Sequence, residues 1–167
     1  NKSSLEQIDK SWNRPERYGI AFKALRENGI DISTEMIIGL DGDDESVFEN
    51  TYKFIIKNKI SIPRVHIITP IPGTQLFEKM ISENRITSED FSRYSGGKAN
   101  FVPKNISAQL LQNGYWDLYR KLFSWHSILK RIFVNEANLG PYMQAVVWAV
   151  NLRYKYHVHH KICPGIV

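Results

Sequence analysis

The sequence contains almost no cysteine, because Cys163 is the only one among its 167 residues. The chain alone can therefore form no intramolecular disulfide and no CxxC redox pair. It also cannot supply the several thiolates that a cysteine-based zinc or iron–sulfur site requires. A single thiol is compatible with the reducing cytosol, and we expect a cytoplasmic location.

Long hydrophobic runs are also absent. The longest apolar stretch, residues 145–150, is far too short to cross a bilayer, and no apolar segment near the start is typical of a signal peptide. The composition, 43% hydrophobic and 23% charged, is that of a globular protein with one domain or two small ones. The sequence begins with Asn rather than Met, and we expect it to be part of a longer chain.

Acidic residues are scarce in one half only. Residues 1–90 carry 12 Lys or Arg against 15 Asp or Glu, whereas residues 91–167 carry 10 against 2. The net charge therefore changes from −3 to +8 at one boundary. This step predicts two regions with different roles, 1–90 and 91–167.

The first region has an alternating pattern of helices and strands. Apolar spacing predicts helices at 14–28, at 46–58 and after Thr74, and buried strands at 30–40 and 62–69. This order is typical of a parallel α/β architecture. The acidic segment 41–46 does not fit a calcium-binding loop, and we expect it to cap the helix that follows. Two parallel strands do not make a stable sheet, so further strands are expected outside this chain.

The second region is predicted to be helical. One helix of about 25 residues is expected to carry a continuous inner stripe, with Gly114 allowing close packing, and a last helix is expected to begin at Gly140-Pro141. The residues of the stripe are Leu111, Tyr115, Leu118, Leu122, Trp125, Leu129 and Ile132.

The end of the last helix is cationic and aromatic. No nucleic-acid motif accompanies these residues, so we expect no nucleic-acid partner. A solvated face is the simplest interpretation, and contact with an anionic membrane surface is an alternative. His157, His159, His160 and Cys163 are of types that bind zinc, but their spacing matches no standard finger, so no metal site is expected.

Four stretches together resemble one enzyme family. Residues 35–44 (Glu-Met-Ile-Ile-Gly-Leu-Asp-Gly-Asp-Asp) and 66–76 (His-Ile-Ile-Thr-Pro-Ile-Pro-Gly-Thr-Gln-Leu) resemble the fifth and sixth barrel strands, with their turns, of radical S-adenosylmethionine (SAM) enzymes. Residues 4–15 resemble the helix after the fourth strand. Residues 94–125 resemble the extension after the barrel in cobalamin-binding members, which include hopanoid-modifying enzymes and anaerobic magnesium-protoporphyrin ester cyclases.

The resemblance implies an α/β fold: the C-terminal portion of a partial (β/α)6 barrel, followed by a mainly helical extension. In the family, a CxxxCxxC loop binds a [4Fe–4S] cluster that cleaves SAM to a 5′-deoxyadenosyl radical, and cobalamin is a second cofactor. This chain lacks the three cysteines, so the resemblance implies an inactive fragment. Its expected partners are the missing N-terminal part of the protein and a hydrophobic small-molecule substrate that undergoes radical methylation or rearrangement. We further expect the isolated fragment to dimerise through its half-exposed sheet edge.

The resemblance also implies a set of cofactor-binding residues at the strand ends, where they would line the SAM pocket. Packing within the barrel core is the alternative for each. These residues are Ile37, Gly39, Ile68, Thr69, Pro70 and Ile71. A different function is an interaction domain whose basic half binds an acidic partner or a membrane surface. A third, an unrelated SAM- or nucleotide-binding enzyme, would need a glycine-rich loop that the sequence lacks.

Overall fold

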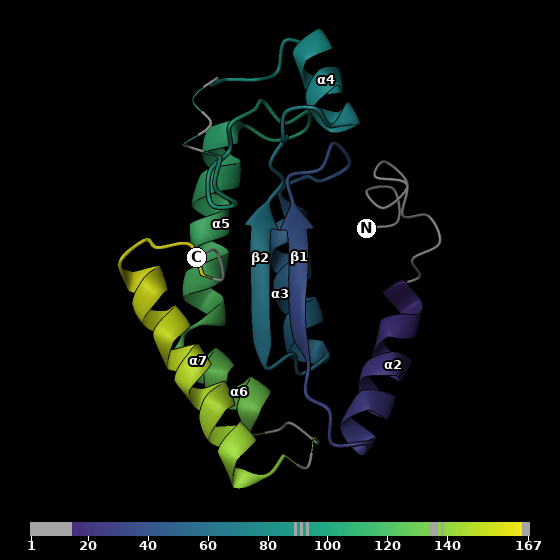
Figure 1. The fold of residues 1–167 in the computed structure, drawn as a ribbon, viewed down its shortest axis with the longest axis vertical. Coiled ribbons are helices and arrows are strands. Elements are labelled where there is room, and N and C mark those ends of the chain that lie inside the picture. The colour runs from purple at the N-terminus through teal and green to yellow at the C-terminus, as the bar shows by residue number, and fades with distance from the viewer. Residues whose placement is uncertain are drawn as a thin grey trace.

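The computed structural model describes residues 15–88, 90, 92, 94–133, 137 and 139–164. The family-like stretch 4–15 therefore lies almost entirely outside the described residues. The described elements (Figure 1), in chain order, are α2 (Pro15–Glu27), β1 (Ser33–Ile38), α3 (Ser46–Lys57), β2 (Ile62–Ile67), α4 (Gln75–Ser82), α5 (Ala108–Leu122), α6 (Trp125–Ile132) and α7 (Pro141–His159).

The two strands form a parallel pair. Their register begins with Ser33 opposite Ile62, and α3 makes the connection between them. The predicted α/β order with parallel strands is thus confirmed. Both strands have six residues and are shorter than the segments 30–40 and 62–69. β1 ends where Gly39 adopts a φ of +89°, which is outside the extended region.

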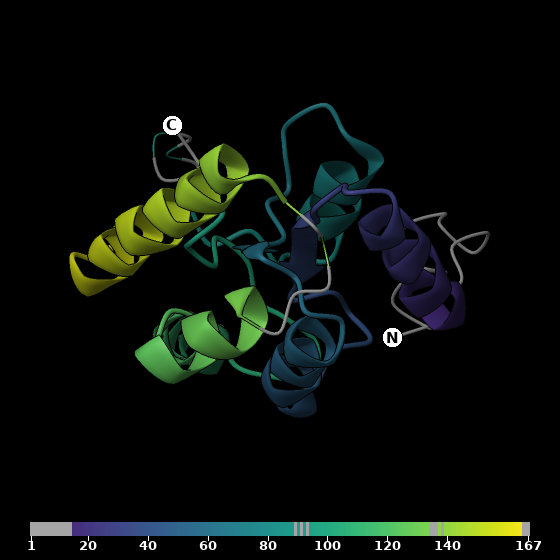
Figure 2. The same ribbon diagram turned by 90° about the horizontal axis from the view of Figure 1, so that it is seen from below.

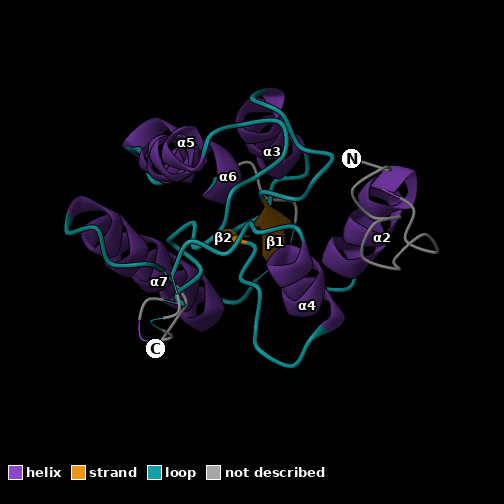
Figure 3. Ribbon diagram, turned by 90° about the horizontal axis from the view of Figure 1, so that it is seen from above, coloured by secondary structure: helices purple, strands orange, loops and turns teal. Residues whose placement is uncertain are grey.

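The core lies on one face of this sheet. Ile38, Val65 and Ile67 point to that face and are almost completely buried. They belong to one hydrophobic cluster with Ile55 of α3 and Leu111 of α5. Figure 3 shows α3, α5 and α6 gathered on the same side of the strands. Burial of each of these side chains contributes roughly 1.5–3 kcal/mol, so this face holds the helices to the sheet.

Gly114 brings α5 close to α3. A Cβ atom at this position would lie 2.3 Å from Cζ of Phe48, which is far inside van der Waals contact. Glycine costs a helix about 1 kcal/mol relative to alanine. The packing of the Phe48 ring on the bare backbone of α5 offsets that cost, and the predicted close approach is confirmed.

The prediction of one long helix across residues 111–132 is wrong. The chain forms α5 and α6, separated by Phe123 and Ser124. Ser124 is extended (ψ 151°), and its Oγ accepts a hydrogen bond from a backbone N–H in the first turn of α6. Because α6 starts anew after the break, it turns a different set of residues towards the core. Trp125 and Leu129 of the expected inner stripe are therefore exposed.

The buried side chain of Arg131 joins the two sides of this break. Its guanidinium donates hydrogen bonds to the carbonyl oxygens of Leu122 (2.9 Å), Ile60 (3.0 Å) and Ser61 (2.7 Å) and to Oδ1 of Asn151 (3.1 Å). The Leu122 carbonyl belongs to the last turn of α5, where carbonyl oxygens find no N–H donor within the helix. Arg131 therefore pairs a carbonyl at the break and ties it to the segment just before β2 and to α7.

The last helix begins at the predicted place. Gly140 is its N-cap and Pro141 its first residue, where proline loses no helical hydrogen bond. Figure 2 shows α7 beside α6, and Val147 and Val158 are its buried apolar contacts with the rest of the molecule.

Candidate functional site

The second face of the sheet faces the viewer in Figure 1, on the side away from α3. Glu35 and Ile37 of β1 point to this face and are exposed, and the strand register places Arg64 and His66 of β2 directly beside them. We call these four residues the open face. Nη2 of Arg64 lies 3.1 Å from Oε1 of Glu35. A partly exposed pair of this kind contributes at most about 1 kcal/mol, so it does little to hold the strands together.

Nδ1 of His66 and Nε of Arg64 are the polar atoms of the open face that are buried without a hydrogen-bond partner among the described residues. Burial lowers the pKa of the His66 imidazole, with Glu35 raising it and Arg64 lowering it by smaller amounts. The ring is therefore neutral at pH 7 and can offer a nitrogen to a ligand. His66 was not among the site residues predicted from the sequence, although a histidine within an apolar strand was a visible signal.

The two outer edges of the sheet differ. On the β2 side, Pro63 has no N–H to leave unpaired, and the hydroxyl of Tyr119 bonds both the N–H (2.9 Å) and the carbonyl (2.8 Å) of Val65. The N–H of Ile67 donates to the carbonyl of Gly96 (2.6 Å). This edge is closed by the chain itself.

The β1 edge is open. In the observed register the even-numbered residues of β1 bond to β2, so the N–H groups of Ser33, Glu35 and Ile37 point outwards. Within the described ranges these three groups have no hydrogen-bond partner. The sheet can therefore be extended on the β1 side and not on the β2 side.

The turn after β1 is fixed by a carboxylate. Oδ2 of Asp43 accepts hydrogen bonds from the N–H groups of Gly39 and Leu40, both at 3.0 Å. A Cβ on Gly39 would lie 2.8 Å from a methyl group of Leu111, so only glycine fits here. The N-cap residue of α3 is Glu45, whose side chain makes no capping hydrogen bond, so the expected capping by the acidic segment is limited to Asp44, whose Oδ1 accepts from the N–H of Ser46 at 2.8 Å.

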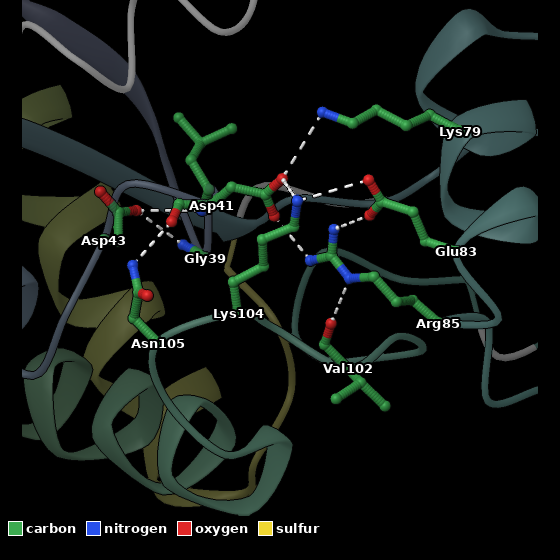
Figure 4. Close-up of polar contacts among 10 residues, drawn as sticks. Gly39, Asp41, Asp43, Lys79, Glu83, Arg85, Val102, Lys104 and Asn105 are labelled. Atoms are coloured by element: carbon green, nitrogen blue, oxygen red, sulfur yellow. Dashed lines mark hydrogen bonds and ion pairs between the residues drawn. The ribbon is translucent and has the colours of Figure 1, made fainter.

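Asp41 is the centre of a cluster of ion pairs above the end of β1, drawn in Figure 4. Its carboxylate lies 2.6 Å from Arg85, 3.5 Å from Lys104 and 3.7 Å from Lys79. Glu83 completes the cluster through Arg85 at 2.8 Å and Lys104 at 3.3 Å. The cluster ties α4 and the segment before α5 to the end of β1. All its charges are paired, so its role is to position these segments.

The residues expected to line a SAM pocket are brought to adjacent strand ends, since the N–H of Ile68 donates to the carbonyl of Ile38 at 2.9 Å. Gly39, Ile68 and Pro70 are buried, Thr69 is half-buried, and Ile37 and Ile71 are exposed. Ile37 is the one of the six that lies on the open face. The assignment of the six residues to SAM stays a prediction.

The C-terminal histidines and cysteine do not converge. Sγ of Cys163 lies 2.8 Å from the hydroxyl of Tyr115, and burial raises the pKa of the thiol, so the neutral form dominates at pH 7. In the part of the chain that the structure describes, no three His, Cys, Asp or Glu side chains are placed to hold a metal ion. No helix among the described residues is both long and apolar enough to span a bilayer.

The chain is similar in sequence to one protein family and to several known enzymes. Residues 74–162 match the family described as "Domain of unknown function (DUF4070)". The chain is 31% identical, over 90% of its length, to the bacteriochlorophyllide d C-12(1)-methyltransferase of Chlorobaculum tepidum, of which it covers 31%. It is 25% identical, over 99% of its length, to the bacteriochlorophyllide d C-8(2)-methyltransferase of the same organism, of which it covers 38%.

A third relative is the anaerobic magnesium-protoporphyrin IX monomethyl ester cyclase of Cereibacter sphaeroides, which is 26% identical over 62% of this chain and is covered to 16%. A cyclase of this name is among those that the sequence stretches resemble, so that resemblance is confirmed. The chain spans about a third of the length of the two methyltransferases.

Proposed function

The chain belongs to the family described as a domain of unknown function (DUF4070), and from this premise we propose that it forms one wall of the reaction chamber in a radical SAM enzyme. The whole enzyme would methylate or rearrange a hydrophobic substrate. In this proposal β2 is the last strand of the barrel, and the preceding strands, supplied by the missing N-terminal part, pair with β1.

The observation that carries this proposal is the asymmetry of the sheet. The described residues cover one face with helices and close the β2 edge with Tyr119 and Gly96, but they place no helix or strand on the open face or against the β1 edge. In a (β/α) barrel, one face of every strand packs on helices and the other lines the interior. The open face has the position of such an interior surface.

The open face suits part of a SAM site. Ile37 would pack against an apolar part of the ligand, and the free Nδ1 of His66 would exchange a hydrogen bond with a polar group. When bound, SAM and the [4Fe–4S] cluster supply the hydrogen-abstraction chemistry that the family resemblance implies. This chain has one cysteine and cannot hold the cluster, so the cluster and cobalamin would be bound by the preceding polypeptide.

The names of the relatives support a macrocyclic substrate for the proposed enzyme. Two of them are named for bacteriochlorophyllide and one for magnesium-protoporphyrin ester, and such macrocycles are large and mostly apolar. The exposed side chains of Ile37 and Ile71 would contribute apolar surface to a chamber for a molecule of this kind. Glu35 and Arg64 would contribute the polar part of its wall.

The test is made on the protein that the complete gene encodes, purified without oxygen. Its upstream coding region is expected to contain a CxxxCxxC segment. Ile37→Trp would fill the space above the open face and should lower the rate of 5′-deoxyadenosine formation from SAM at least tenfold. The matched control, Ile20→Trp on the exposed side of α2, should stay within twofold of the wild type.

Two results would overturn the proposal. One is an upstream coding region without the three-cysteine segment. The other is an Ile37→Trp enzyme that folds, as judged by its Tm, and cleaves SAM as fast as the control.

A further inference from the structure

The outward side of α6 is apolar where a surface helix is normally polar. Trp125, Leu129 and Phe133 are spaced by four residues and form one stripe along the helix. The side chain of Trp125 is 53% exposed and that of Phe133 is 73% exposed. The core contacts of α6 are made by Ile128 and Arg131. The stripe therefore does not stabilise the fold from inside.

The stripe continues onto α7, where Leu152 and Tyr156 are exposed. The two helices lie side by side (Figures 1 and 2). Nζ of Lys155 on α7 lies 5.2 Å from the centre of the Trp125 ring, and the Phe133 ring is 5.5 Å from that of Trp148. We call Trp125, Leu129, Phe133, Leu152 and Tyr156 the α6–α7 surface.

Cations border this surface. A groove of about 460 Å³ between the end of α5 and the second half of α7 is lined by Arg120, Lys155 and Lys161, together with Leu152 and Tyr156 of the surface itself. Lys130 is exposed on α6 beside the apolar stripe. Among the described residues from 118 onwards the sequence has no Asp or Glu. Asp117, which pairs with Arg120, is the nearest preceding carboxylate.

We propose that the α6–α7 surface docks the protein on an anionic lipid bilayer. Exposed Trp, Phe and Leu side chains enter the boundary between headgroups and acyl chains, while Lys and Arg stay among the anionic headgroups. Both requirements are met by the same two helices. No described helix can span the bilayer, so the contact is peripheral. This inference does not depend on the reaction proposed above.

Charge decides against two other occupants of the surface. A second copy of this chain would bring the same cations against one another, with no carboxylate on the described parts of either surface to pair with them. An acidic soluble protein would pair with Lys130 and Lys161 but would not by itself require the exposed aromatic stripe. An anionic bilayer complements the charge and the apolar side chains together.

The experiment measures binding of the 167-residue chain to sedimented vesicles. One set of vesicles is pure phosphatidylcholine, which has no net charge, and the other contains about 30% of the anionic lipid phosphatidylglycerol. We expect binding only to the anionic vesicles, weakened by added salt. Lys130→Glu with Lys161→Glu should weaken it at least about tenfold, since each cation near such a surface contributes about a fivefold factor. Phe133→Ser should weaken it several-fold with an unchanged Tm.

The matched control is Lys57→Glu with Lys98→Glu, which makes the same change in net charge at two exposed lysines outside the surface. It should leave binding within twofold of the wild type. Equal weakening by both double variants would mean a response to net charge alone and would overturn the proposal. It would also be overturned if Phe133→Ser bound normally while soluble polyglutamate displaced the vesicles, because that result indicates an acidic protein partner.

Discussion

Arg131 stabilises the break between α5 and α6, which the apolar spacing of the sequence did not predict. The apolar steps of four and three continue without interruption from Leu111 to Ile132, and they give no sign of a break. The break is stabilised by a buried guanidinium that satisfies carbonyl groups distant in sequence. Burial lowers the pKa of Arg131 to about 10, so the side chain still carries its charge and donates its hydrogen bonds at pH 7. Such tertiary partners cannot be inferred from local periodicity.

Asp41 should make the stability of the protein dependent on acid. Burial raises its pKa, but the hydrogen bonds and charges of Arg85 and Lys104 outweigh burial and hold the pKa below its ordinary value of 3.8. The ionised carboxylate therefore stabilises the fold above about pH 4, and this contribution is lost as the pH falls through the lowered pKa. We expect Asp41→Asn to lower the free energy of unfolding by about 1–2 kcal/mol at pH 7.

Urea unfolding at pH 7 and at pH 3 measures this effect. The difference between the wild type and Asp41→Asn should shrink as the pH is lowered from 7 to 3, because below the ordinary pKa of 3.8 the unfolded chain takes up a proton at Asp41. Asp117→Asn is the control, because Asp117 is exposed and pairs only with its helix neighbour Arg120. If the difference in the free energy of unfolding between the wild type and Asp41→Asn were the same at both pH values, the ionised carboxylate of Asp41 would not be the source of the stabilisation.

At the scale of elements, the order of helices and strands was predictable because each has a strong local signal. The segments 46–58 and 62–69 have clear periods and end at turn residues, and both appear within a few residues of the expected bounds. The partners of the acidic segment were not predictable. The carboxylate of Asp41 accepts from Arg85, and that of Asp43 accepts from the N–H of Gly39, in place of the helix N–H groups. Both donors lie outside the segment.

Two glycines in helices should respond oppositely to alanine. At Gly114 a Cβ would collide with the Phe48 ring at 2.3 Å, so α3 and α5 would have to separate. We expect Gly114→Ala to destabilise the fold by about 1–3 kcal/mol despite its better helix propensity. At Gly19 of α2 the nearest atom outside its own helix, Oδ1 of Asn58, would be 3.6 Å away.

Gly19→Ala should therefore stabilise the protein by about 0.5–1 kcal/mol. Thermal unfolding of both variants makes the comparison, with opposite signs of the change in Tm as the expected result. If Gly114→Ala also raised the Tm, the close contact between α3 and α5 would not be the reason for the glycine.

For the whole molecule, the sequence indicated which strand ends come together but not which face of the sheet stays open. That depends on where α5 and α6 pack, and their packing depends on tertiary contacts such as Tyr119 with Val65. Ile37 was singled out from the family resemblance, whereas Arg64 and His66 became candidates only once the register placed them on the same face. The alternation of side chains along a strand predicts which residues share a face, but it does not tell which face the helices cover.

We predict that the isolated chain dimerises through β1. The outward N–H groups of Ser33, Glu35 and Ile37 have no partner among the described residues, and an uncovered edge seeks another strand. Light scattering should give twice the 19.4 kDa mass of the chain. Glu35→Pro removes one outward N–H without touching the bonds to β2 and should shift the protein to monomer. A monodisperse wild-type monomer at high concentration would contradict this.

The closed β2 edge sets a limit on such assembly. Pro63 has no N–H to offer, and the hydroxyl of Tyr119 already occupies the backbone of Val65. A pair joined through two β1 strands would therefore present a closed edge at each end. A third chain would find no strand to extend, so growth into fibres stops at two copies.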